Sequence, residues 1–247
     1  MIKEKLKLAK KEEVAANVYK FTLEGSHIPP RCSPGRFLHV QAGDGRAMLL
    51  RRPISISAAD DQTCVIIFRA SGAGTEAIAS VRVGDTIDVF GPLGSGFPLL
   101  DDGTALLVGG GVGVPPLHFL AEELVKNGIR VKSVIGFRSA EDVFLADELR
   151  QYGEVEVTTE DGTYGTKGYV TDAALMNSEF DTFYACGPKA MLHPLQENIE
   201  APGYVSLEER MGCGIGACFA CVCDKKDGGY VKICSDGPVF EKGVVQL

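Results

Sequence analysis

The sequence predicts a multidomain β plus α/β protein built from three units. Residues 1–100 read as short strands broken by glycine and proline turns, which is typical of a small antiparallel β-barrel. Strand and helix patterns then alternate over residues 101–207, which indicates a central parallel-sheet domain of the nucleotide-binding type. Residues 208–247 form a small C-terminal unit that is rich in cysteine.

Six strands are expected in the barrel unit, and glycine and proline turns separate them. The predicted strands are Lys5–Lys10, Val18–Leu23, Arg36–Gln41, Ile54–Ser57, Cys64–Ala70 and Thr86–Phe90. A short helix is expected over Glu76–Ser80. A stiff glycine- and proline-rich segment, residues 91–98, then leads into the second unit.

The central unit is expected to alternate five strands with four helices. The predicted strands are Ala105–Val108, Val131–Phe137, Val155–Thr159, Thr182–Ala185 and Tyr204–Leu207. The predicted helices are Pro115–Asn127, Ala140–Gln151, Tyr169–Leu175 and Lys189–Ile199. In the first helix, apolar side chains recur at helical spacing and mark a buried face: Leu117, Leu120, Ala121 and Leu124.

Composition narrows the classes of partner and compartment. Hydrophobic residues make up 45% of the chain, which is enough for well-formed cores. The net charge of −8 argues against nucleic acid or an anionic membrane as the main partner. No stretch approaches the ~18 apolar residues of a membrane helix. Eight cysteines without an apolar export signal at the start indicate a reducing cytoplasm.

Four cysteines near the C-terminus have the spacing of a metal-binding loop. Cys213, Cys218, Cys221 and Cys234 are separated by four, two and twelve residues, and plant-type ferredoxins use a four-then-two gap with a distant fourth cysteine. We therefore expect these thiolates to hold a [2Fe–2S] cluster. Structural zinc is the alternative, although only one Cys-x-x-Cys pair is in register, and disulfides suit smaller secreted domains. Cys223 lies two residues past Cys221 and is interpreted as a buried structural residue.

A glycine loop follows the first predicted strand of the central unit and opens a helix. Gly110, Gly111 and Gly113 belong to this loop, and a helix start next to glycines lets backbone N–H groups approach a phosphate. A second loop, Cys186-Gly187-Pro188, ends the fourth predicted strand. Ligands bind at the carboxyl ends of parallel strands, so we expect this loop to border the nicotinamide of a dinucleotide.

These residues do not decide between NADH and NADPH. A dinucleotide site usually has an acidic residue at the end of the second strand, where it holds the ribose 2′-OH. Here that strand ends in Gly136-Phe137-Arg138-Ser139, which offers no carboxylate, and Arg138 would suit a 2′-phosphate.

Two segments of the barrel unit are candidates for a flavin site. Arg52, Pro53, Ile54 and Ser55 start one strand, and Arg52 and Ser55 supply a cation and a hydroxyl for a pyrophosphate and a flavin ring edge. The second segment ends the next strand and opens a short helix: Ile67, Phe68, Arg69, Gly74 and Thr75. Ordinary surface arginines are the alternative. Two such segments ahead of a nucleotide-type domain favour FAD.

The combination of Arg-Pro-Ile-Ser, Gly-Gly-Gly-Val-Gly and Cys-Gly-Pro resembles the ferredoxin–NADP reductase superfamily. The segment from Leu207 to Cys221, with Cys234-Ser-Asp-Gly-Pro after it, resembles the electron-transfer subunits of NAD-dependent (class 1B) dihydroorotate dehydrogenases. The resemblance covers nearly the whole chain, and the cysteine segment is its most specific part.

The resemblance implies a role inside a complex. Such subunits bind FAD and one [2Fe–2S] cluster and dock on a catalytic subunit that carries FMN, in a hetero-complex that we expect to be a heterotetramer. Dihydroorotate is oxidised at the FMN, and electrons cross the cluster and the FAD to NAD⁺. The resemblance places the FAD contacts on the two barrel segments above and the cluster on the four cysteines. It also favours NAD over NADP, and we expect residues around 212–219 to line the interface.

No catalytic side chain is expected, since hydride transfer at a flavin needs no acid or base. The isolated residues His27, His39, His118 and His193 are interpreted as structural. One alternative function is a subunit of a related NAD(P)H-dependent sulfide dehydrogenase or ferredoxin:NADP⁺ oxidoreductase. A second alternative is a non-enzymatic binding module held together by zinc.

Overall fold

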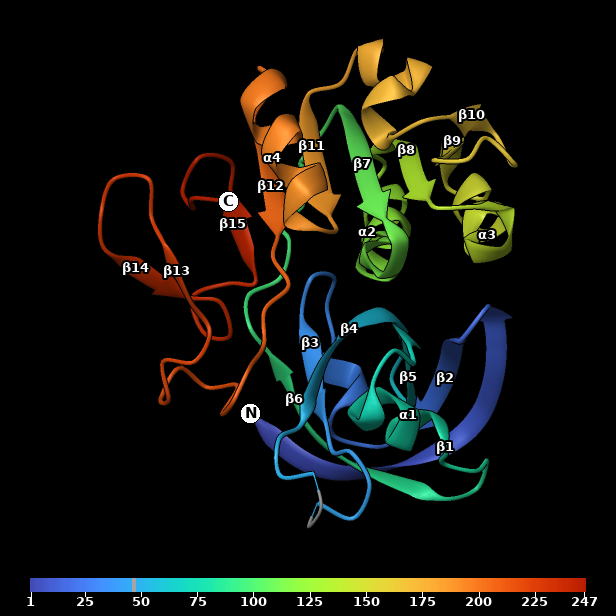
Figure 1. The fold of residues 1–247 in the computed structure, drawn as a ribbon, viewed down its shortest axis with the longest axis vertical. Coiled ribbons are helices and arrows are strands. Elements are labelled where there is room, and N and C mark those ends of the chain that lie inside the picture. Colours follow the sequence, from blue (N-terminus) through green and yellow to red (C-terminus); the bar gives the residue numbers. More distant parts are fainter. Residues whose placement is uncertain (46–47) are drawn as a thin grey trace.

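The structure is a computed structural model that describes residues 1–45 and 48–247. Figure 1 shows an antiparallel barrel, a mainly parallel sheet stacked next to it, and the cysteine-rich segment along one side of both. This architecture confirms the predicted fold class.

The barrel closes in the strand order β1-β2-β5-β4-β3-β6. Its elements are β1 (Ile2–Ala15), β2 (Val18–Glu24), β3 (Phe37–Val40), β4 (Arg52–Ala59), β5 (Thr63–Arg69), α1 (Ala73–Ala79) and β6 (Thr86–Leu93). Side chains alternate between the two faces of each strand. On β3, Leu38 and Val40 fill the barrel core, whereas Phe37 packs outside it against the cysteine-rich segment. The outer face of β3 therefore supports the third unit.

The central sheet has the order β10-β9-β8-β7-β11-β12-β15. Its strands are β7 (Thr104–Gly110), β8 (Arg130–Phe137), β9 (Gly153–Thr159), β10 (Thr166–Lys167), β11 (Thr182–Cys186), β12 (Gly203–Ser206) and β15 (Val239–Glu241). The first six run parallel, and β15 pairs antiparallel with β12. The helices of this unit are α2 (Val114–Lys126), α3 (Ala146–Arg150) and α4 (Lys189–Asn198).

Two predicted helices differ from the structure. The segment predicted as a helix over Ala140–Gln151 is a 3₁₀ turn at Ala140–Asp142 followed by the short α3, because Leu145 adopts a left-handed φ of 62° between them. The predicted helix Tyr169–Leu175 is instead two successive 3₁₀ turns. Such short segments form too few hydrogen bonds to offset the cost of starting an α-helix.

Helix α2 joins the central unit to the barrel. Pro115 and Pro116 lie in its first turn, where no helical N–H is needed, and the apolar face predicted from the sequence is buried. On the other side, His118 Nδ1 lies 2.9 Å from the Ser57 carbonyl oxygen of β4. Burial lowers the pKa of His118, so the ring is neutral in this contact. The contact fixes the position of the helix that begins at the glycine loop.

The C-terminal unit shares its core with its neighbours. Its hairpin consists of β13 (Val222–Asp224) and β14 (Tyr230–Lys232). Cys221 and Cys234 lie in one apolar cluster with Leu207 and with Phe37 of the barrel. The domain limits 1–100, 101–207 and 208–247 stay predictions. Among the described residues, no helix combines the length and apolar character that a membrane crossing requires.

Candidate functional site

The four predicted cluster cysteines lie in one loop system and accept backbone hydrogen bonds. The Cys213 sulfur accepts from the N–H groups of Ile215, Ala217 and Cys218 at 3.3–3.4 Å. The Cys218 sulfur accepts from the Cys213 N–H at 3.3 Å. The Cys234 sulfur accepts from the Gly216 N–H at 3.1 Å, and the Cys221 sulfur accepts from the Cys234 N–H at 3.4 Å. Such donors stabilise thiolate sulfurs and tune a bound cluster.

The sulfurs fall into two pairs. Cys213 and Cys218 interact through their side chains, and so do Cys221 and Cys234. Burial alone would raise the pKa of Cys213. The hydrogen bonds from backbone N–H groups to its sulfur outweigh this effect and lower the pKa of Cys213 to about 6. Burial and the bond to Cys221 raise the pKa of Cys234 to about 12. Among residues 1–45 and 48–247, no three His, Cys, Asp or Glu side chains surround one ion position.

Glycine is required at two places in this loop. Gly214 and Gly216 have φ values of +74° and +79°, which L side chains rarely adopt. A Cβ on Gly214 would also lie 2.8 Å from His39 Nδ1 and 3.0 Å from Leu93 Cδ1. The loop therefore rests directly on the outer face of the barrel.

Except for Gly74, the predicted flavin residues of the barrel line one cavity of about 810 Å³. Its wall includes Arg52, Pro53, Ile54, Ser55, Ile67, Phe68, Arg69 and Thr75. Gly74 lies against the Arg52 side chain, and a Cβ there would overlap the guanidinium group. The structure thus brings the two barrel segments together beside the Arg52 guanidinium group, which fits the pyrophosphate of a dinucleotide.

A second cavity, of about 600 Å³, lies over the carboxyl ends of the central strands. Gly110, Gly111 and Pro188 line it. Gly113 is buried, and a Cβ there would overlap the Cys186 carbonyl, so this glycine lets the two loops pack together. Gly187 lies outside both cavity walls, and Cys186, with a thiol pKa that burial raises, lines the flavin cavity.

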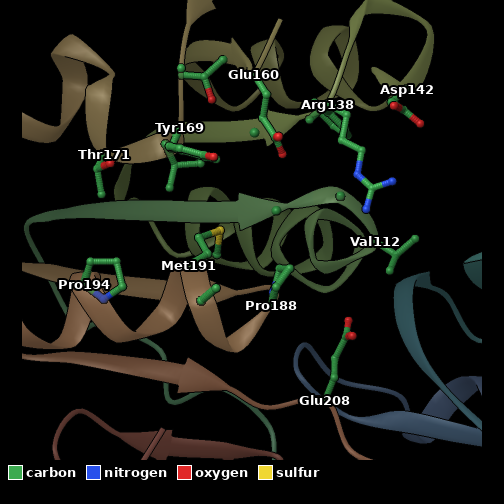
Figure 2. A pocket seen from close by; sticks show the side chains of 18 of the residues that line it. Val112, Arg138, Asp142, Glu160, Tyr169, Thr171, Pro188, Met191, Pro194 and Glu208 are labelled. Carbon is green, nitrogen blue, oxygen red and sulfur yellow. The ribbon is translucent and has the colours of Figure 1, made fainter.

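Sequence reasoning named Arg138 and Pro188 of this second cavity but missed Glu160 and Met191. Figure 2 shows Arg138 and Glu160 extending into it from one side, with Pro188 and Met191 on the other. Glu160 directly follows β9, the strand next to β8. The sequence offers no carboxylate at the end of β8. The neighbouring parallel strand β9 ends at the same edge of the sheet, and Glu160 supplies the carboxylate there.

The two cavities adjoin each other. Arg69, Val112 and Glu208 line both of them. Figure 2 shows Glu208 reaching toward the nucleotide cavity from the segment after β12. Although its side chain is exposed, desolvation by the surrounding protein raises the pKa of the Glu208 carboxyl. Its position, two residues after a parallel strand, was the sequence signal that could have identified it.

Two family models match parts of this chain. Residues 208–246 match the family model of the iron–sulfur cluster binding domain of dihydroorotate dehydrogenase B, and residues 107–197 match the oxidoreductase NAD-binding domain. Among solved structures, the NADH-dependent reduced ferredoxin–NADP oxidoreductase is similar, with a TM-score of 0.89 and 28% identity over 98% of this chain and 89% of that one. Phthalate dioxygenase reductase shares the fold, with a TM-score of 0.66 and 21% identity over 99% of this chain and 98% of that one.

Two relatives are similar over nearly their whole length. Both are dihydroorotate dehydrogenase B (NAD⁺) electron transfer subunits. The one from Shouchella clausii is 49% identical over 98% of each chain, and the one from Geobacillus kaustophilus is 48% identical over 99% of each. These matches confirm the resemblance seen in the sequence. The chain belongs to the family of dihydroorotate dehydrogenase B (NAD⁺) electron transfer subunits.

Proposed function

We propose that this chain passes electrons from a catalytic subunit that carries FMN to NAD⁺, as the electron-transfer subunit of a dihydroorotate dehydrogenase. Its cofactors are a [2Fe–2S] cluster and FAD, and NAD is its co-substrate. One observation carries this proposal: the flavin cavity adjoins the nucleotide cavity at Arg69, Val112 and Glu208. On its other side, Phe37 and Met211 of the flavin cavity pack in the same core as Cys221 and Cys234.

The barrel residues hold the flavin. Arg52 neutralises the pyrophosphate, Gly74 leaves room for the guanidinium group, and Ser55 contacts the ring edge. When bound, the flavin exchanges an electron pair with the nicotinamide and single electrons with the cluster. The apolar side chains Ile54, Ile67 and Phe68 help to exclude water from this region.

The central sheet holds the dinucleotide. Gly110 and Gly111 bring the backbone and the start of α2 close to its phosphates, and Pro188 borders the nicotinamide. Glu160 accepts a hydrogen bond from the adenosine ribose 2′-OH and repels a 2′-phosphate. This carboxylate supports NAD over NADP, the choice that β8 alone left open.

The paired cysteines hold the cluster. Cys213 and Cys218 form one pair and Cys221 and Cys234 the other, so each pair suits one of the two irons. A single zinc ion would need all four sulfurs around one centre. The Cys223 sulfur instead donates to the carbonyl oxygen of Gln246, which supports its structural role.

The partner docks over the cluster loop. Ile215 and Phe219 flank the cysteines and are 44% and 49% exposed, and Tyr230 next to Phe219 is 56% exposed. Exposed apolar side chains around a redox centre suit a permanent interface. We propose a heterotetramer of two copies of each subunit. We place it in the cytoplasm, where eight free cysteines stay reduced.

The test begins with protein prepared without air. The proposal expects flavin and iron–sulfur absorbance, two irons per chain, and dye reduction by NADH well above that by NADPH. Co-expression with the FMN subunit should give one complex in size-exclusion chromatography. A preparation without FAD and iron would overturn the proposal, and so would a chain that elutes apart from its partner.

A related sulfide dehydrogenase or ferredoxin:NADP⁺ oxidoreductase subunit is the second candidate. The TM-score of 0.89 with the NADH-dependent reduced ferredoxin–NADP oxidoreductase supports this second candidate through similarity of fold. The higher identity to dihydroorotate dehydrogenase subunits favours the first. Orotate formation by the reconstituted pair distinguishes the two.

A further inference from the structure

Strand β3 forms the wall between the flavin cavity and the cluster loop. Phe37 lines the flavin cavity and also packs in the core that contains Cys221 and Cys234. His39 lies two residues further on the same outer face, at 6.5 Å from the Phe37 ring centre. In the antiparallel register, Phe37 lies opposite Ser55 and His39 opposite Pro53, both of the flavin segment. The His39 ring therefore has the flavin segment on one side.

On its other side, the His39 ring faces the cluster loop. Gly214 approaches so closely that a Cβ would lie 2.8 Å from His39 Nδ1. Gly214 directly follows Cys213, whose sulfur accepts hydrogen bonds from three backbone N–H groups.

The His39 ring is buried without a hydrogen-bond partner. It is only 1% exposed, and neither ring nitrogen has a partner among the described residues. Burial lowers its pKa to about 4, as do the charges of Arg51 and Arg52, while an interaction with the Arg51 backbone opposes the shift. A neutral imidazole carries one N–H. Buried polar groups without partners are rare, and a bound redox group is one reason for them.

We propose that His39 is a positioning residue that donates its ring N–H toward the iron–sulfur cluster on the Cys213 side. This inference rests on the proposed function, since it needs the cluster. Reduction adds negative charge to a cluster, and a donor directed at its sulfurs favours the reduced state. His39 therefore raises the reduction potential of the cluster and aids electron transfer from the partner.

The first experiment is an EPR-monitored redox titration of the anaerobic holoprotein. His39→Leu removes the donor, and His39→Asn keeps an N–H near the position of Nδ1. We expect a lower midpoint potential and shifted g-values in His39→Leu, with both restored toward wild type in His39→Asn. The matched control is His118→Leu, which removes a buried imidazole at the α2–β4 contact and should leave the potential unchanged. An unchanged potential in an iron-loaded His39→Leu protein would overturn the proposal.

A second measurement needs no variant to fold. Wild-type protein with ¹⁵N-labelled histidine is reduced and examined by pulsed EPR for coupling between the cluster spin and one histidine nitrogen. The coupling should be present in the wild-type protein. Its absence in wild type would also overturn the proposal. Failure of the proposed function is distinct, because a chain without a cluster gives no EPR signal in either experiment.

Discussion

Arg69 of β5 and Asp142 of the central unit form an ion pair, with 2.8 Å between Nη2 and Oδ1. Both side chains lie beside the nucleotide cavity, and Arg69 also donates to the Ala16 carbonyl of the barrel. The pair thus links the unit that binds the flavin to the unit that binds the nicotinamide.

Breaking this ion pair should loosen the contact between the two units. Asp142→Asn is expected to lower the free energy of unfolding by about 1 kcal/mol, because the pair is only partly shielded from water. Denaturant unfolding of the holoprotein measures the change. The control is Asp147→Asn, whose partner Arg150 lies on the same short helix and is also exposed, and it should change stability by less than about 0.5 kcal/mol. Equal effects of the two changes would contradict a linking role.

Two glycines of one turn provide a matched test of the flavin cavity. Gly74→Ala places a methyl group on the Arg52 guanidinium, whereas a Cβ on Gly72 meets nothing within 4 Å. Losing a charge-assisted contact should weaken FAD binding by about tenfold in Gly74→Ala. Gly72→Ala should bind FAD like wild type. FAD titration of the stripped protein gives both affinities, and equal losses would place the pyrophosphate away from Arg52.

The preference for NADH should depend on Glu160. Glu160→Gln removes the charge that opposes a 2′-phosphate, so the ratio of kcat/KM for NADPH to that for NADH should rise by about tenfold. Dye-reduction kinetics with each nucleotide measure this ratio. Glu141→Gln changes an exposed carboxylate outside the cavity wall and serves as the control. A ratio that moves equally in both variants would remove Glu160 from the site.

Two neighbouring cysteines should differ in their effect on iron content. Cys221→Ser removes a proposed ligand whose sulfur pairs with Cys234, and we expect loss of the cluster. Cys223→Ser changes a sulfur that is bonded to the Gln246 carbonyl, and we expect the two irons to stay bound. Iron assay and visible spectra distinguish the two outcomes. Loss of iron in Cys223→Ser but not in Cys221→Ser would show that Cys223, and not Cys221, is the third ligand of the cluster.

The sequence was most informative where a pattern has one physical solution. The spacing of Cys213 to Cys221 and the alternation of strands and helices predicted the cysteine loop and the sheet correctly. Helix extent was predicted less well, because the left-handed Leu145 depends on packing that periodicity does not show. Glu160 was missed for a related reason, since the edge shared by β8 and β9 exists only in the folded sheet.

The outer face of β3 shows the same limit. Phe-Leu-His-Val reads as a buried strand, and nothing in the four residues distinguishes an interior side chain from one beneath another unit. Only the register with β4 and the approach of Gly214 separate the position of His39 from that of Leu38.

Strand β15 has a consequence for how this protein could be divided. It leaves the cysteine-rich segment, crosses back and occupies the edge of the nucleotide domain beside β12. A shortened chain ending at Leu207 would leave that edge open to pairing with other molecules. The cysteine-rich unit and the nucleotide domain should therefore unfold together in one cooperative transition. A chimera that exchanged only the cysteine-rich unit would have to supply a replacement for β15.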